Sequence, residues 1–228
     1  MNIDHFGMDT ITLAGPLEAK LRVIREAGFT QVMLNAADLV GHPGGEDAAV
    51  RAVRESGLRV TGFQVLRDFE GLSGHLHAYK LDVAKALLAM CRAIGSNVLL
   101  ACSSTSAHAT GDKDSLIRDL RKLALLAVPY GIRIAYEALS WGRHVNLLIQ
   151  AWEIVRDADR SNLGICLDSY HVLAHGTDTD VVDTIVGFLS RADALLGEGV
   201  RRRARGDLPD PAVLMQPAAP AQSPAPSA

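Results

Sequence analysis

One pattern recurs along the chain: a segment with helical spacing of apolar residues ends at a turn residue, and a short apolar run follows. The turn residue is Gly28, Gly57, Gly95 or Gly131 in four cases, and Asn162 in the fifth. Gly and Asn tolerate the left-handed backbone conformation with which many helices end. Helices that alternate with strands fold as right-handed βαβ units around a parallel sheet. The pattern therefore predicts an α/β fold.

The spacing of the units predicts a barrel. We expect strands over residues 10–13, 31–34, 60–65, 98–101, 132–136 and 163–167, which gives six βα units. Four units lie between Gly28 and Asn162 at about 33.5 residues each, so eight would need about 268 residues, more than this chain has. The chain has 228 residues. We therefore expect a (β/α)8 TIM-barrel type of fold that is incomplete.

The last part of the sequence has a different composition. A helix is expected to begin near Asp178, and residues 185–189 fit either its end or a weak seventh strand. Six of the nine prolines lie after residue 208, and residues 217–228 consist of Pro, Ala, Ser and Gln. Such a segment cannot bury a core. We predict a partial TIM barrel over residues 1–190 and a disordered Pro/Ala-rich tail over residues 191–228.

Composition excludes several classes of function. The net charge is −3, and the positive residues before residue 200 are scattered, which argues against a nucleic-acid surface. No apolar run is long enough for a membrane span or has the flanks of a signal peptide. The three cysteines are far apart, which favours buried free thiols in a reducing compartment. A cytoplasmic protein is expected.

Two carboxylates follow apolar runs on neighbouring predicted strands. Glu137 ends the run before it, and Asp168 ends the next one. Parallel strands lie about 4.8 Å apart, and their carboxyl ends share one edge of the sheet. Both acids can therefore reach one ion, and oxygen ligands favour Mg²⁺, Mn²⁺ or a similar divalent metal. The alternative is that either acid only caps the helix that follows.

Other candidate residues lie near the same edge. His171, three residues after Asp168, could move a proton, or could simply bond to the main chain of its loop. Arg143 and His144 follow the strand that ends at Glu137 and are candidates for substrate binding, because an arginine fork holds carboxylate or phosphate. Arg67 is a second candidate anion ligand, with a structural ion pair to a neighbouring acid as the alternative.

Three segments resemble the xylose-isomerase-like TIM-barrel superfamily of sugar phosphate isomerases and epimerases, and within it the bacterial 3-dehydroshikimate dehydratases. The segments are Gln64…Arg67-Asp68-Phe69-Glu70-Gly71, Tyr136-Glu137-Ala138-Leu139-Ser140-Trp141-Gly142-Arg143-His144-Val145-Asn146 and Leu167-Asp168-Ser169-Tyr170-His171. Together with the strand rhythm, the likeness covers roughly residues 8–186.

The resemblance implies a metal held by four side chains, of which Glu137 and Asp168 match the first two. It implies a metal-dependent lyase. In this reaction the substrate, 3-dehydroshikimate, loses a proton next to its ketone and then loses water, which gives protocatechuate. Arg67 and Arg143 would bind the substrate, and His171, with Glu137, would serve in catalysis. No segment after residue 187 matches the other two ligands, so we expect impaired activity.

Three readings of function stay open. They are the dehydratase-type lyase, a sugar phosphate isomerase or epimerase that uses the same metal, and a non-catalytic remnant. The expected substrate is a small carboxylated keto-polyol or keto sugar, with neither nucleic acid nor membrane as a partner. A homo-oligomer is possible, because a second subunit could cover the strands left at the edges of an incomplete barrel.

Overall fold

The computed structural model describes residues 3, 6–178, 180–183 and 185. Contacts divide the chain into two compact units, Met1–Thr177 and Asp178–Ala228. In the second unit, residues 180–183 are helical, which agrees with the helix expected near Asp178. The predicted domain boundary at residue 190 and the predicted tail lie outside the described residues.

The first unit is a six-stranded parallel sheet whose strands follow one another in chain order, β1-β2-β3-β4-β5-β6. The strands are β1 (Gly7–Asp9), β2 (Gln31–Asn35), β3 (Arg59–Arg67), β4 (Val98–Cys102), β5 (Arg133–Glu137) and β6 (Leu163–Ile165). The helices are η2 (Thr10–Thr12), α1 (Leu17–Glu26), α2 (Ala36–Val40), α3 (Glu46–Glu55), α4 (Gly74–Ile94), α5 (Lys113–Ala127), η3 (Val128–Tyr130), α6 (Leu148–Ala158) and α7 (Ser169–Ala174).

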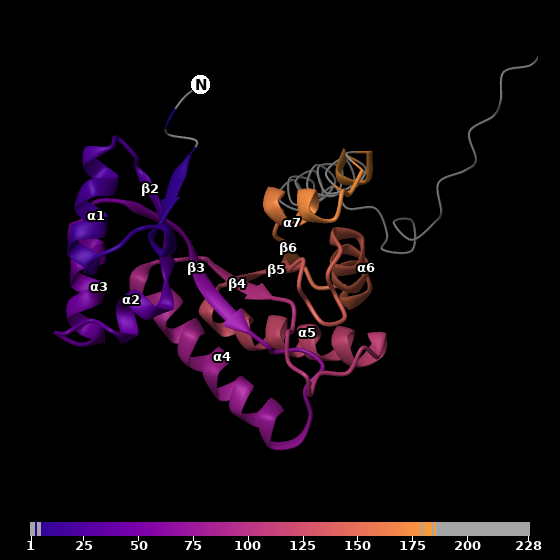
Figure 1. Cartoon of the computed structure of the whole chain (residues 1–228). Helices are drawn as coiled ribbons and strands as arrows, with labels where there is room; N and C mark the ends of the chain where they lie inside the picture. The colour runs from indigo at the N-terminus through magenta and orange to yellow at the C-terminus, as the bar shows by residue number, and fades with distance from the viewer. Residues whose placement is uncertain (1–2, 4–5, 179, 184, 186–228) are drawn as a thin grey trace, which may run out of the picture. The chain divides into compact units, whose positions relative to one another are not determined.

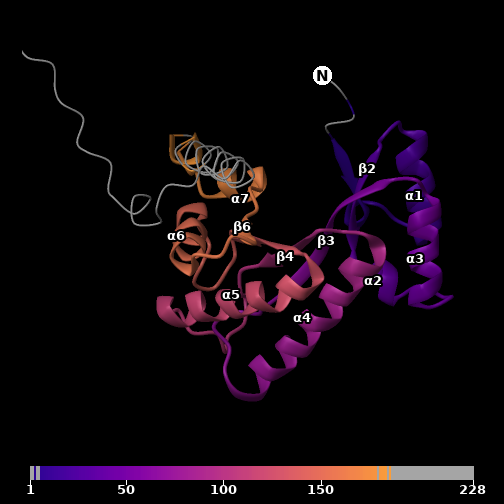
Figure 2. The same ribbon diagram turned by 180° about the vertical axis from the view of Figure 1, so that it is seen from behind.

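The long helices α1, α3, α4, α5 and α6 contact one another in that order, as the helices around a parallel barrel do (Figure 1). The view from behind shows the same succession of helices along the sheet (Figure 2). The six parallel strands and this succession confirm the predicted TIM-barrel type. In the described part of the chain, no helix has the length and apolar character that crossing a membrane requires.

Side chains alternate between the two faces of the sheet. The face toward the helices carries the main core, in which Phe63, Leu99 and Tyr136 are fully buried. The other face carries a smaller apolar cluster that includes Leu100 and Cys102. This second cluster lies directly beneath the carboxyl ends of the strands, where Cys102 is the last residue of β4.

Two details of the prediction were wrong. The first strand was expected over residues 10–13, but β1 ends at Asp9, whose side chain accepts a hydrogen bond from the Ile11 amide (3.0 Å) and starts a turn of 3-10 helix. Asn162 was expected to end the helix before β6, but the left-handed residue there is Asp159, with φ of 50°. Asn162 instead donates its side-chain amide to the Ala124 carbonyl (2.8 Å).

Candidate functional site

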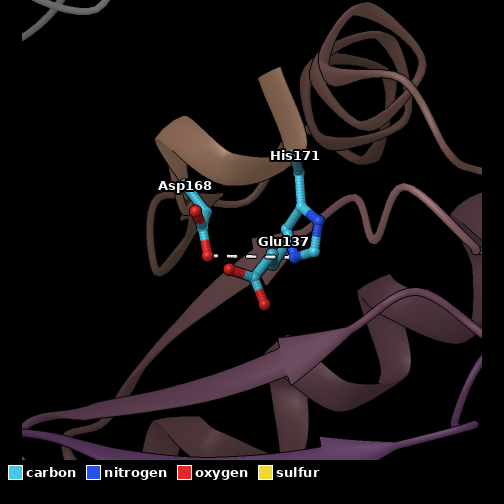
Figure 3. A group of neighbouring side chains, drawn as sticks. All are labelled: Glu137, Asp168 and His171. Atoms are coloured by element: carbon cyan, nitrogen blue, oxygen red, sulfur yellow. Dashed lines mark ion pairs between the residues drawn. The ribbon is translucent and has the colours of Figure 1, made fainter. Parts of the chain in front are cut away.

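Glu137, Asp168 and His171 lie together at the carboxyl end of the sheet (Figure 3). Glu137 is the last residue of β5, Asp168 is the N-cap of α7, and His171 lies within α7. One potential ligand atom from each of the three lies within 4.8 Å of the others. The His171 Nε2 to Asp168 Oδ2 distance is 3.8 Å. The structure thus brings together the two predicted metal ligands and the predicted proton carrier.

The Glu137 carboxylate is buried with weak donors around it. Glu137 is 7% exposed. Cys102 Sγ donates to Oε2 (3.0 Å), and Cys166 Sγ donates to Oε1 (3.7 Å). Thiols are weak hydrogen-bond donors, and a buried carboxylate needs strong donors or a cation. Among the described residues no ion pair reaches Glu137, so its donor set fits a site that takes up a metal cation.

The protonation of the two thiols follows from their surroundings. Burial raises the pKa of Cys166 to about 12, and the charge of Glu137 and its hydrogen bond act in the same direction. Burial raises the pKa of Cys102 still further, and the hydrogen bond to Glu137 and its charge add to this, while the charge of Arg67 lowers it in part. Both cysteines are therefore protonated at neutral pH and can donate to the carboxylate.

The carboxylate of Asp168 has two roles available to it. Its Oδ1 accepts from the Tyr170 amide (2.7 Å) and so caps α7. Its Oδ2 lies on the side of His171. Capping occupies one oxygen and leaves the other for an ion. The helix cap and the metal ligand, which the sequence presented as alternatives, are compatible in this geometry.

The tautomer of His171 follows from its bond to the main chain. The Ser140 amide donates to His171 Nδ1 (3.2 Å). A main-chain N–H can only donate, so Nδ1 of the neutral ring carries no proton and Nε2 carries it. His175 Nε2 meets the Ser140 carbonyl (2.8 Å), and the Trp141 and His171 rings pack in a T-shaped arrangement (centroids 5.0 Å apart). These contacts hold the Nε2 proton toward Asp168.

The predicted substrate-binding residues differ in their exposure and in the groups that they contact. Arg67 ends β3 and is exposed, and its charge reaches Cys102. Within residues 6–178 no ion pair holds its guanidinium, so the ion-pair alternative is not observed. Arg143 is exposed, and its amide donates to the Ser104 carbonyl (2.8 Å). His144 Nε2 meets the Ala109 carbonyl (2.9 Å), a contact that holds the loop after β4.

Two polar groups at this end of the sheet were not among the predicted site residues. Asp9 ends β1, and the Gln64 side chain donates to its Oδ2. Burial raises the pKa of Asp9, and hydrogen bonds from Ile11 and Gln64 oppose this. Asp9 follows the same rule as Glu137, an acid at a strand end. The misplaced first strand hid this signal in the sequence.

Glu70 is the second missed group. It is 2% exposed, and its Oε1 accepts from the Ser104 amide (2.5 Å) and the Tyr136 hydroxyl (3.0 Å). Burial raises its pKa to about 7, although these bonds and one from its own amide lower it. Asp68 accepts from the Thr105 amide (2.8 Å). The two acids fasten the loop after β3 to the loop after β4.

Comparisons with known proteins agree with this fold. The family described as Xylose isomerase-like TIM barrel matches residues 21–196. A protein of Pseudomonas putida named 3-dehydroshikimate dehydratase is 39% identical over 189 residues, which cover 81% of this chain and 30% of that protein. The chain thus spans less than a third of the length of this curated relative.

Two solved structures are similar to the chain. A xylose isomerase-like TIM barrel/4-hydroxyphenylpyruvate dioxygenase fusion protein is 40% identical with a TM-score of 0.70, covering 73% of this chain and 27% of that one. An IolI protein with a bound zinc atom is 22% identical with a TM-score of 0.67, covering 76% of this chain and 66% of that one. The second likeness extends to the fold alone.

Proposed function

The chain belongs to the xylose isomerase-like TIM barrel family, and from that premise we propose that it is a divalent-metal-dependent lyase of the 3-dehydroshikimate dehydratase type. The observation that carries the proposal is the grouping of Glu137, Asp168 and His171 at the carboxyl end of the sheet. The 39% identity of the chain to a relative named for this activity supports the choice of reaction.

Glu137 and Asp168 would hold the ion. Their donors are carboxylate oxygens, which suit Mg²⁺, Mn²⁺ or a similar divalent metal. When bound, such an ion supplies Lewis acidity that polarises a ketone oxygen and eases loss of the proton on the next carbon. The buried, weakly compensated charge of Glu137 favours uptake of a cation at this point.

His171 acts in this proposal as a hydrogen-bond donor. Its Nδ1 is occupied by the Ser140 amide, so the proton of the neutral ring is on Nε2. A hydrogen bond from this N–H would stabilise the departing hydroxyl of the substrate, which leaves as water together with the proton lost from the carbon next to the ketone. Loss of that water from a cyclic dehydroshikimate gives the aromatic product, protocatechuate. The neighbouring Trp141 shields one side of the imidazole from solvent.

Arg67 and Arg143 would recognise the substrate carboxylate. Both residues are exposed at the edge of the sheet where the site lies. Arg67 ends β3, and Arg143 follows β5. Neither is held in an ion pair within the described part of the chain. A free arginine fork binds a carboxylate with two parallel hydrogen bonds. Preference for a carboxylated substrate is what separates the lyase from an isomerase of neutral sugars.

The proposal includes low turnover by this 228-residue chain alone. The resemblance implies four ligand positions, and the described residues supply two of them, Glu137 and Asp168. Loss of part of a ligand set lowers metal affinity and activity. We expect slow product formation that rises with the concentration of added metal.

The test is to incubate the purified chain with 3-dehydroshikimate and Mg²⁺ or Mn²⁺ and to follow the aromatic absorbance of protocatechuate. We expect metal-dependent product formation that Glu137→Gln abolishes. An isomerised product without aromatic absorbance would favour the isomerase reading. Absence of both metal binding and turnover would favour the non-catalytic reading and refute the proposal.

A further inference from the structure

The Glu137 carboxylate lies between Cys102, the last residue of β4, and Cys166, the residue directly after β6. Cys102 is the register partner of Glu137 across β4 and β5, and Tyr136 pairs with Ile165 across β5 and β6. Cys166, the next residue of the chain, therefore comes level with Glu137 on the other side. Residues level with one another on parallel strands present their side chains to the same face of the sheet.

Each carboxylate oxygen has its own thiol. Oε2 receives the Cys102 S–H at 3.0 Å, and Oε1 receives the Cys166 S–H at 3.7 Å. Among the described residues, these are the hydrogen bonds that reach the Glu137 side chain. The plane of the carboxylate is therefore fixed from two sides, by Cys102 at the end of β4 and by Cys166 directly after β6.

We propose that Cys102 and Cys166 are positioning residues that clamp the Glu137 carboxylate between β4 and β6 and thereby set its affinity for the metal. The inference rests on the proposed function, since it assumes that Glu137 is a metal ligand. Groups that hydrogen-bond to a ligand orient it, and losing one of them typically lowers metal affinity by about 10- to 100-fold.

The two thiols contribute unequally. Cys102 is buried and makes the shorter bond, whereas Cys166 is partly exposed and makes the longer one. Loss of the Cys102 donor frees the carboxylate to rotate and also removes a buried side chain beneath it. Loss of the Cys166 donor removes the weaker of the two bonds. We therefore expect Cys102→Ala to weaken metal binding more than Cys166→Ala does.

Serine substitutions separate positioning from packing. A hydroxyl donates a stronger hydrogen bond than a thiol but reaches less far. Cys102 Sγ lies 3.0 Å from Glu137 Oε2, close enough for the shorter serine side chain to keep a hydrogen bond. Cys102→Ser should therefore keep most of the metal affinity. Cys166 Sγ lies 3.7 Å from Glu137 Oε1, too far for a serine hydroxyl to reach the carboxylate. Cys166→Ser should therefore behave like Cys166→Ala. Cys91→Ala is the matched control, because Cys91 is a fully buried free thiol in α4, away from the site.

The experiment measures the dissociation constant of Mn²⁺ by competition with a chelator, and the thermal midpoint, for the full chain and each variant. We expect Cys102→Ala to weaken Mn²⁺ binding at least 10-fold, Cys102→Ser to restore it, and Cys91→Ala to leave it unchanged. Equal Mn²⁺ affinity in Cys102→Ala and the parent chain would overturn the clamp, whatever happens to the thermal midpoint.

A metal-free readout distinguishes failure of the clamp from failure of the proposed function. The infrared S–H stretch of Cys102 should lie at lower frequency than that of Cys91, and Glu137→Ala should remove the difference. If the parent chain binds no Mn²⁺ while this shift is present, the proposed function fails and the hydrogen-bond clamp stands without its role in metal binding. If the shift is absent, the clamp itself is refuted.

Discussion

Burial of Glu70 predicts a loss of stability as the pH rises. The side chain is 2% exposed and has no ion pair among the described residues. Its carboxylate accepts from the Ser104 amide and the Tyr136 hydroxyl. Because burial disfavours the charged form more than these bonds favour it, the pKa of Glu70 is raised to about 7.

The direction and the size of this pH effect follow from the linkage between proton binding and folding. The folded state binds the Glu70 proton more tightly than the unfolded state, so the stabilisation is fully present below the unfolded pKa of 4.5 and is lost as the pH rises through about 7. A shift from 4.5 to about 7 corresponds to about 3 kcal/mol in the free energy of unfolding. By the same linkage, most of this, about 2.5 kcal/mol, falls between about pH 5 and about pH 8.5.

The measurement is urea unfolding, followed by circular dichroism at several pH values, of the parent chain and Glu70→Gln. Glutamine keeps an acceptor for Ser104 and Tyr136 but cannot ionise, so the fall in stability between about pH 5 and about pH 8.5 should shrink by about 2.5 kcal/mol. Glu55→Gln, an exposed glutamate at the end of α3, is the control and should leave the pH dependence unchanged. The reasoning is refuted if parent and Glu70→Gln show parallel pH profiles.

Three further predictions concern the same end of the sheet. Asp168→Asn should abolish metal binding in a chelator titration while keeping the cap of α7. Asp168→Ala should abolish metal binding and also lower the free energy of unfolding by about 1 kcal/mol. Equal stabilities of the two variants would argue against the cap. Tyr136→Phe removes a donor to Glu70, so urea unfolding should show a loss of about 1–3 kcal/mol that is larger above neutral pH; a loss independent of pH would contradict this. Gly142→Ala would place a Cβ against the Val145 carbonyl and 2.6 Å from Ser103 Oγ, and should cost about 1–3 kcal/mol in the same assay. Gly164→Ala, which meets nothing within 4 Å, should be tolerated, and similar effects of the two changes would show that the loop after β5 is not tightly packed.

The sheet could be predicted because its strands are apolar runs between recurring helix ends. Gly95 and Gly131 have φ of 75° and 69°, as a left-handed helix end requires, and the strands after them begin within three residues. The first strand was misplaced because Asp9 ends it early by capping a short 3-10 turn, an interaction between neighbouring residues that apolar spacing does not record. The short α7 was not predicted as a separate element, although the sequence had offered Asp168 as a possible helix cap.

The site was predictable only in part, because its residues are of two kinds. Acids that follow apolar runs can be found from the sequence, and Glu137 and Asp168 were found in that way, although β6 ends at Ile165, before Asp168. Interactions between strands depend on register. The pairing of Cys102 with Glu137, and the bond from the Ser140 amide that fixes the His171 tautomer, both join segments that are distant in sequence. Nothing in the local pattern of residues carries that information.

Two buried glutamates at one end of this sheet illustrate how surroundings assign a role to a residue type. Glu70 faces a fixed amide and a hydroxyl, and it is satisfied by these donors together with a proton, so it joins two loops. Glu137 faces two weak thiol donors and lies within 4.8 Å of another carboxylate and an imidazole. Two carboxylates so close repel each other, and one divalent ion would compensate the charge of both. In the proposed function, the difference in donors, rather than burial alone, therefore assigns metal binding to Glu137 and leaves Glu70 as part of the scaffold.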